Sequence, residues 1–167
     1  MKTATTFGAS KIDKKSPYYK EGIELGKLLA KKGYRVKCGG YGGLMEAVSK
    51  GVYEAGGECI GVGLEYFDAL RPKNPYLSKK ILAKDLYERL RLLIEGSELF
   101  IAQYGSIGTL NEIFMVLALK YGGIKPNIRI ILLGDIYKKM AGCEFLDENF
   151  RKNVEICSNL KELEDKI

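Results

Sequence analysis

Short apolar runs alternate with helix-like segments along the whole chain, and this alternation restricts the fold more than any other feature. The first helix is marked by Ser16 as its cap and by Pro17 in its first position. Strands are predicted at residues 3–8, 34–38, 59–64, 80–83, 98–103, 128–134 and 154–158, and the main helices at 17–33, 44–57, 85–96 and 109–121. Strands that alternate with helices lie parallel and are joined by right-handed crossovers. The sequence therefore predicts an α/β fold, a Rossmann-like doubly wound parallel sheet with helices on both faces.

Length and composition predict one domain over residues 1–167. Of the 167 residues, 46% are hydrophobic, which is enough for a core without a disulfide or metal. The N-terminus lacks the pattern of a signal or transit peptide, and the longest apolar run, "IFMVLAL", is too short to cross a bilayer. We therefore expect a cytoplasmic protein without a membrane partner.

The chain contains no histidine, which excludes Ser-His-Asp and Cys-His catalysis within one chain. Cys38, Cys59, Cys143 and Cys157 form no C-x-x-C pair, so no zinc site is predicted. Three of them lie in or beside predicted strands, where cysteine usually acts as a small buried side chain. No metal or cofactor is implied, and acid–base chemistry is left to Asp, Glu, Lys, Tyr or Cys.

The formal charge of +6 comes from scattered pairs such as "AKKG" and "SKKI". This pattern differs from the concentrated basic stripe of a nucleic-acid-binding protein. It fits a solvated surface that attracts anionic small molecules. A nucleic-acid-associated function is the weakest of the interpretations that we consider.

Three predicted strands run into glycine loops that precede helices: "FGAS", "CGGYGG" and "QYGSIGT". In a parallel sheet, ligands bind beyond the carboxyl ends of the strands, and the free N–H groups of a helix start favour a phosphate. The first loop lacks the dinucleotide motif G-x-G-x-x-G, and the Lys-Ser/Thr phosphate loop is absent. The three loops together predict a phosphate-bearing small molecule as the ligand.

The segments "GGYGGLMEAVSKGVYEAGG" and "YGSIGTLNE" resemble the two signatures of the Lonely Guy family, whose members were formerly called lysine decarboxylases. The family's third element, M-H-x-R-K, corresponds to "LYERL" at residues 86–90. The resemblance covers most of the chain. It implies a nucleoside 5′-monophosphate phosphoribohydrolase, which releases the base and ribose 5-phosphate.

The resemblance also implies which residues form the site. Arg89 and Glu112 take the catalytic positions. Residues of the glycine loops bind the substrate and its phosphate: Gly8, Ser10, Gly40, Gly43, Gly105, Ser106, Gly108 and Thr109.

The chain departs from the family pattern at four positions. Tyr104 and Ser106 replace the proline and the second glycine of P-G-G-x-G-T-x-x-E, and Tyr87 and Leu90 replace the histidine and lysine of M-H-x-R-K. The "GGYGGLMEAV" form is also similar to the molybdenum cofactor carrier proteins, which bind without this hydrolysis. A non-catalytic carrier of a nucleotide or of the molybdenum cofactor is therefore the alternative function.

Two of the candidate residues also have simple structural interpretations. Thr109 and Glu112 form T-x-x-E before an apolar run, which is the pattern of a helix capping box. Arg89 is predicted at the edge of an inward stripe formed by Leu86, Leu90, Leu93 and Ile94, from which its head reaches either a cleft or solvent.

Two segments other than the glycine loops, residues 64–78 and the helix at 109–121, also bear on function. Residues 64–78 look irregular and form either a lid or a packed connection. The helix at 109–121 is apolar nearly all round, so we expect one side to face the sheet and the other a partner in a homodimer.

Overall fold

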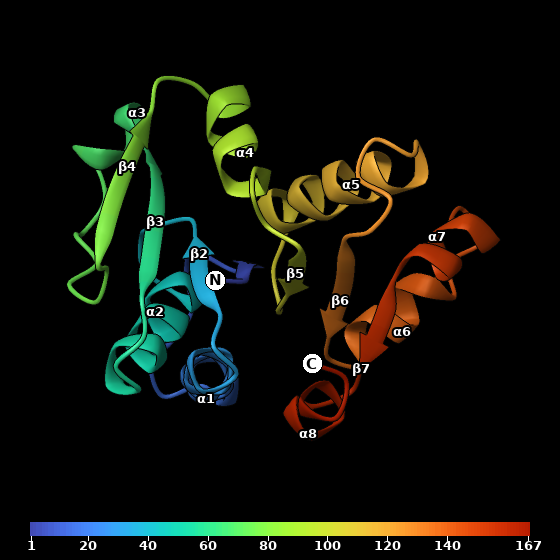
Figure 1. Cartoon of the computed structure of the whole chain (residues 1–167), viewed down its shortest axis with the longest axis horizontal. Coiled ribbons are helices and arrows are strands. Elements are labelled where there is room, and N and C mark those ends of the chain that lie inside the picture. The colour runs from blue at the N-terminus through green and yellow to red at the C-terminus, as the bar shows by residue number, and fades with distance from the viewer.

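A computed structural model describes residues 1–167 and contains one sheet of seven parallel strands in the order β4-β3-β2-β1-β5-β6-β7 (Figure 1). The chain runs from β1 outward to β4, then returns to place β5 on the other side of β1. The order therefore reverses between β1 and β5, where such folds bind ligands. The predicted doubly wound fold is confirmed. The strands are β1 Thr3–Phe7, β2 Arg35–Cys38, β3 Cys59–Leu64, β4 Lys79–Ala83, β5 Leu99–Ala102, β6 Arg129–Leu133 and β7 Glu155–Cys157.

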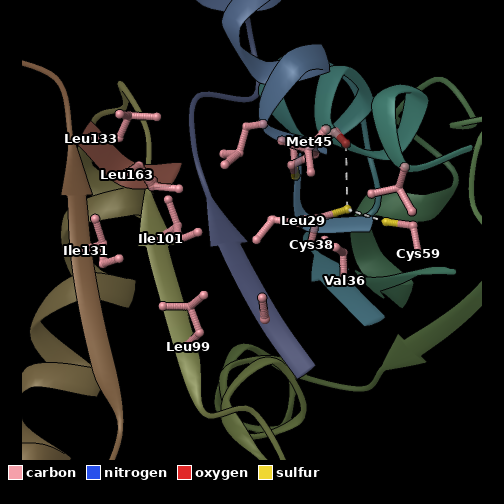
Figure 2. Close-up of a cluster of buried hydrophobic side chains, with 14 of the residues drawn as sticks. Leu29, Val36, Cys38, Met45, Cys59, Leu99, Ile101, Ile131, Leu133 and Leu163 are labelled. Carbon is pink, nitrogen blue, oxygen red and sulfur yellow. Dashed lines mark hydrogen bonds between the residues drawn. The ribbon is translucent and has the colours of Figure 1, made fainter. Parts of the chain in front are cut away.

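Helices cover both faces of the sheet. Two clusters of buried side chains divide the core, and β5 shows the alternation, since Leu99 and Ile101 belong to one cluster and Phe100 and Ala102 to the other. The first cluster packs under α1, α2 and α8, and Figure 2 shows Leu163 of α8 beside Ile101. The second packs under α4 to α7. The helices are α1 Pro17–Lys31, α2 Leu44–Glu54, α3 Glu65–Asp68, α4 Leu86–Ile94, α5 Ile107–Tyr121, α6 Ile136–Ala141, α7 Glu148–Asn153 and α8 Leu160–Glu164.

Most predicted boundaries agree with the structure. Ser16 caps α1 as expected, and its Oγ accepts a hydrogen bond from the Tyr19 N–H at 3.2 Å. Cys38, Cys59 and Cys157 are buried and Cys143 is exposed, as the positions of the strands predicted. Figure 2 shows Cys38 and Cys59 facing each other, with their Sγ atoms 3.9 Å apart.

Three expectations were wrong. Residues 64–78 are not irregular throughout, because α3 forms one helical turn directly after β3. Helix α5 begins at Ile107, two residues before the predicted start. Leu86 does not belong to the inward stripe of α4, since it is 60% exposed while Leu93 and Ile94 are buried.

Helices α1 and α2 pack so closely that their glycines leave no room for a side chain. A Cβ atom on Gly51 of α2 would overlap the Ile23 carbonyl oxygen of α1, and one on Gly26 would overlap the Val48 carbonyl oxygen. Helix α2 begins at Leu44, directly after the glycine loop that follows β2. The close packing against α1 therefore fixes the position of α2 next to that loop.

Changing Gly51 to alanine should destabilise the fold, because the methyl group must push two backbones apart. Overpacking of this kind costs about 2 kcal/mol or more, which exceeds the roughly 1 kcal/mol that alanine gains over glycine in a helix. Urea unfolding measures the difference. Gly108→Ala is the matched control, since a Cβ at that helical glycine meets no atom within 4 Å. Equal stability of the two variants would contradict this account.

Candidate functional site

A cleft of about 500 Å³ lies beyond the carboxyl ends of the central strands, where the strand order reverses. The loop after β1, the start of α5 and one side of α4 contribute most of its wall. The predicted residues that line it are Gly8, Ser10, Arg89, Ser106, Gly108, Thr109 and Glu112. The structure thus brings three separated sequence motifs to one cavity.

Backbone hydrogen bonds of Ala9 join the three glycine loops. The Ala9 N–H donates to the Tyr104 carbonyl, and the Ala9 carbonyl accepts from the Leu44 N–H, both at 2.9 Å. Gly43, with φ of 66°, precedes Leu44 and would press a Cβ atom against the Ala9 carbonyl oxygen. Glycine is therefore required there on two grounds, backbone conformation and space.

The N-terminus of α5 presents free backbone donors at the cleft. The first hydrogen bond of the helix runs from the Leu110 N–H to the Ser106 carbonyl at 2.9 Å. The N–H groups of Ile107, Gly108 and Thr109 precede it, and the Ser106 side chain caps none of them. Three donors and the positive end of a 15-residue helix therefore face the cavity, an arrangement that suits an anion.

The capping-box interpretation of Thr109 and Glu112 is wrong. Helix α5 begins at Ile107 after Ser106, so Thr109 is the third helical residue and Glu112 the sixth. A capping box needs the threonine in the flanking position, outside the first turn. The carboxyl group of Glu112 consequently has no part in starting the helix and projects into the cleft lining.

The Arg89 side chain extends from α4 to β3 and to the residue that follows β2. Its Nε donates to the Val62 carbonyl at 2.9 Å and its Nη2 to the Gly39 carbonyl at 3.2 Å. Its Nη1 lies 3.9 Å from Glu112 Oε1. Only 15% of the side chain is exposed, so Arg89 points into the cleft and not to solvent.

Burial raises the pKa of Glu112 to about 7, although the nearby Arg89 guanidinium acts in the opposite direction. Burial prevails because the guanidinium is 3.9 Å away and two of its nitrogen atoms already donate to carbonyl groups. The Glu112 carboxyl therefore changes protonation near neutral pH. Such a group can serve as a base, an acid or an electrostatic stabiliser.

Three predicted residues do not line the cleft. Gly40, with φ of 77°, packs against the Gly61 backbone, and Gly43 supports the Ala9 turn. Gly105 lies behind the start of α5, where a Cβ atom would overlap the Thr109 side chain. All three glycines support the conformation of the loops, and other residues form the surface of the cleft.

The structure adds lining residues that the motifs did not indicate, chiefly Met45, Phe67, Arg71 and Asn111. Met45 and Asn111 lie inside quoted motifs but were not singled out. Phe67 and Arg71 come from the segment 64–78, and its length was the one signal that it might contribute to a site.

The four departures from the family pattern have different structural settings. The Tyr104 ring stacks on Tyr18 of α1, with centroids 4.6 Å apart and an angle of 17°. Tyr87 is 87% exposed and lies outside the cleft, whereas Leu90 and Ser106 line it. The lysine of the family is thus replaced by an apolar group within the cavity itself.

No group of three or more His, Cys, Asp or Glu side chains in the chain is placed to hold a metal ion. None of the helices combines the length and the apolar character that a membrane crossing needs.

Comparison with protein families places the chain among known relatives. The model of the SLOG cluster4 family matches residues 1–162. The chain therefore belongs to this family, and the predicted kinship with the Lonely Guy proteins is confirmed.

Named relatives and solved structures agree with this placement. The chain is 27% identical to a cytokinin riboside 5′-monophosphate phosphoribohydrolase of Rhodococcoides fascians, over 96% of this chain and 86% of the relative. It is 30% identical to the probable enzyme of that name, LOGL6, of Oryza sativa subsp. japonica, over 96% and 68%. The crystal structure of TM1055 is similar over the full length of both chains, with a TM-score of 0.78 and 31% identity. The molybdenum cofactor carrier protein of Chlamydomonas reinhardtii has the same fold, with a TM-score of 0.78 and 21% identity over 99% and 94%.

Replacing Glu112 with glutamine should stabilise the protein at pH 8 and not at pH 4. Because the pKa of Glu112 is higher in the folded chain than its usual 4.5, the group favours folding when protonated, and this contribution is lost as pH rises from 4.5 to about 7. The expected gain for the variant is up to about 3 kcal/mol above pH 7. Urea unfolding at both pH values measures it, with the exposed Glu144→Gln as control. A gain that is the same at both pH values would show that Glu112 does not titrate as described.

Proposed function

We propose that the cleft hydrolyses the N-glycosidic bond of a nucleoside 5′-monophosphate, giving the free base and ribose 5-phosphate. The observation that carries the proposal is the pairing of an open helix N-terminus with a buried carboxyl group one turn further along the same helix. The relatives named as cytokinin riboside 5′-monophosphate phosphoribohydrolases support this reaction.

The 5′-phosphate would rest on the N–H groups of Ile107, Gly108 and Thr109. Because the Ser106 side chain makes no capping bond, these donors are available to phosphate oxygens. The binding energy of the phosphate then holds the ribose beside Glu112. The phosphate itself takes no part in the bond that breaks.

Glu112 would act on the ribose as the glycosidic bond opens. The bond between C1′ and the base nitrogen breaks, a water oxygen bonds to C1′, and one water proton ends on the base. The transition state has the character of a ribosyl cation, which an ionised carboxylate stabilises. A pKa of about 7 leaves a large fraction of Glu112 ionised at neutral pH.

Arg89 would hold this carboxylate in place. Its bonds to the Val62 and Gly39 carbonyls fix the guanidinium, and Nη1 is directed to Glu112. The arginine thus supplies the single nearby positive charge that favours the ionised carboxyl. From the same position it can neutralise the substrate phosphate or assist the departing base.

A carrier function without turnover is the second candidate. Ser106 and Leu90 stand in the cleft where the family pattern has glycine and lysine, and both changes alter the surface that meets the ligand. Proteins of this fold include molybdenum cofactor carriers. Incubation with a panel of nucleoside 5′-monophosphates separates the two functions, because hydrolysis releases free base and a carrier only binds.

Glu112→Gln should lower base release by about 10² or more, since the negative charge is lost while the shape is kept. Binding of the monophosphate should persist, because the N–H donors of α5 remain. Chromatography of the free base and calorimetric titration of the nucleotide measure the two quantities. The exposed Glu144→Gln is the control. Near-normal base release by the folded Glu112→Gln protein would remove Glu112 from the reaction.

We also propose that α5 mediates a homodimer. Ile113, Val116 and Leu117 pack on the sheet, but Phe114 and Met115 on the other side are each 40% exposed. Further exposed apolar side chains continue this surface at both ends of the helix: Ile107, Tyr121 and Ile124. A two-fold axis would place the same helix of a second copy against it.

Met115→Glu should convert the dimer to a monomer, because the new carboxylate would be buried against apolar side chains of the second copy. Sedimentation at micromolar concentration measures the mass. Tyr53→Glu, at an exposed site on α2, is the control and should leave the dimer intact. A monomeric unmodified protein under these conditions would refute the dimer.

A further inference from the structure

Arg71 places an unpaired cation in the cleft, at the end formed by the segment after β3. Its guanidinium carbon lies 4.1 Å from the centre of the Phe67 ring and 5.3 Å from that of Tyr41. Tyr41 is itself fixed, since its hydroxyl group donates to the Leu64 carbonyl and accepts from the Leu64 N–H. Two aromatic rings therefore hold the guanidinium in position at the cleft wall.

Nothing within the chain uses the donors of Arg71. The neighbouring carboxylate, Asp68, pairs with Lys80, and the Arg71 side chain has neither an ion pair nor a hydrogen bond. Arg89, by contrast, donates to two carbonyl groups and faces Glu112. A half-buried guanidinium with five N–H groups and no acceptor is suited to a ligand that brings acceptors.

The position of Arg71 assigns it to the part of the ligand farthest from the phosphate. In the sheet order β3-β2-β1-β5, the strand before Arg71 is three steps from the strand before the α5 N-terminus. Adjacent strands are about 4.8 Å apart, so the two ends of the cleft are separated by roughly 14 Å. A nucleotide whose phosphate lies on α5 and whose ribose lies at Glu112 therefore directs its base toward Phe67 and Arg71.

The chemistry of the guanidinium selects among bases. Two parallel N–H groups match two acceptors side by side, and a 6-oxopurine offers that pair in O6 and N7. A 6-aminopurine presents a donor beside N7, so one N–H of the arginine would face another N–H. Contact with the Phe67 ring at 4.1 Å restricts the movement of the fork, which makes the discrimination geometric as well as electrostatic.

We propose that Arg71, held on Phe67, reads the base and selects 6-oxopurine over 6-aminopurine nucleoside 5′-monophosphates. This inference rests on the proposed placement of a nucleoside monophosphate in the cleft. It makes Arg71 a specificity-determining residue, separate from the group that acts on the glycosidic bond.

Calorimetric titration of three compounds tests the proposal: guanosine 5′-monophosphate, adenosine 5′-monophosphate and ribose 5-phosphate. The unmodified protein should bind the guanosine compound about 10-fold to 100-fold more tightly than the adenosine compound. Arg71→Gln should reverse or abolish this ratio, because a glutamine amide matches the donor and acceptor of a 6-aminopurine. Arg71→Lys should also reduce the ratio, since it keeps the charge and loses the fork. Affinity for ribose 5-phosphate should not change in either variant.

Lys73→Gln removes one positive charge from the same exposed segment and serves as the control, with no expected effect on the ratio. Equal losses for all three compounds in Arg71→Gln would mean that Arg71 holds the phosphate and would overturn the proposal. The proposal would also be overturned if Arg71→Gln unfolds at the temperature of the unmodified protein and keeps its ratio of guanosine to adenosine monophosphate affinity. Binding is measured apart from base release, so a protein that binds with the expected ratio but releases no base would refute hydrolysis and leave the role of Arg71 intact.

Discussion

The peptide groups on either side of the Ala9 α-carbon hold the cleft together. Its N–H donates to the loop that leads into α5, and its carbonyl accepts from the first residue of α2. The loop after β1 is thereby fixed between the loops after β2 and β5. Since these contacts are made by backbone atoms, they require a close approach and not a particular side chain, which is why glycine is needed at Gly43.

Two charged side chains of the cleft, Arg89 and Glu112, differ in how many partners they have. Arg89 uses its donors on the carbonyl groups of Val62, within β3, and of Gly39, directly after β2. Glu112 is left with one cation at 3.9 Å, and the burial of its carboxyl group outweighs that cation and raises its pKa to about 7. In the proposed reaction, the same burial that makes the carboxylate costly to form would make its charge effective on the ribose, because a buried site screens weakly.

Sequence patterns predicted the layered fold well, because buried parallel strands leave apolar runs such as residues 59–64 that match β3 residue for residue. The start of α5 was misplaced because Ser106 and Thr109 are both acceptable caps, and only the backbone path decides between them. Leu86 was misassigned because α4 turns one side to the cleft and not to the core. The contact of Arg71 with Phe67 left no motif, since two residues four positions apart come together only when the segment folds.

Strand β4 is at the edge of the sheet and pairs with β3 alone, and the segment between these two strands carries Phe67 and Arg71. Residues 105–109 and Glu112, in contrast, follow β5 at the centre of the sheet. Substitutions of Phe67 and Arg71 therefore leave the pairing of the central strands unchanged, whereas Asn74 of the same segment is tied to the Tyr41 carbonyl and the Ser49 hydroxyl. Under the proposed function, the part of the cleft assigned to the base can thus differ between relatives while the residues around Glu112 stay the same. Two relatives that share every signature can for that reason act on different compounds. The edge segments should therefore be compared before the substrate of one relative is assigned to another.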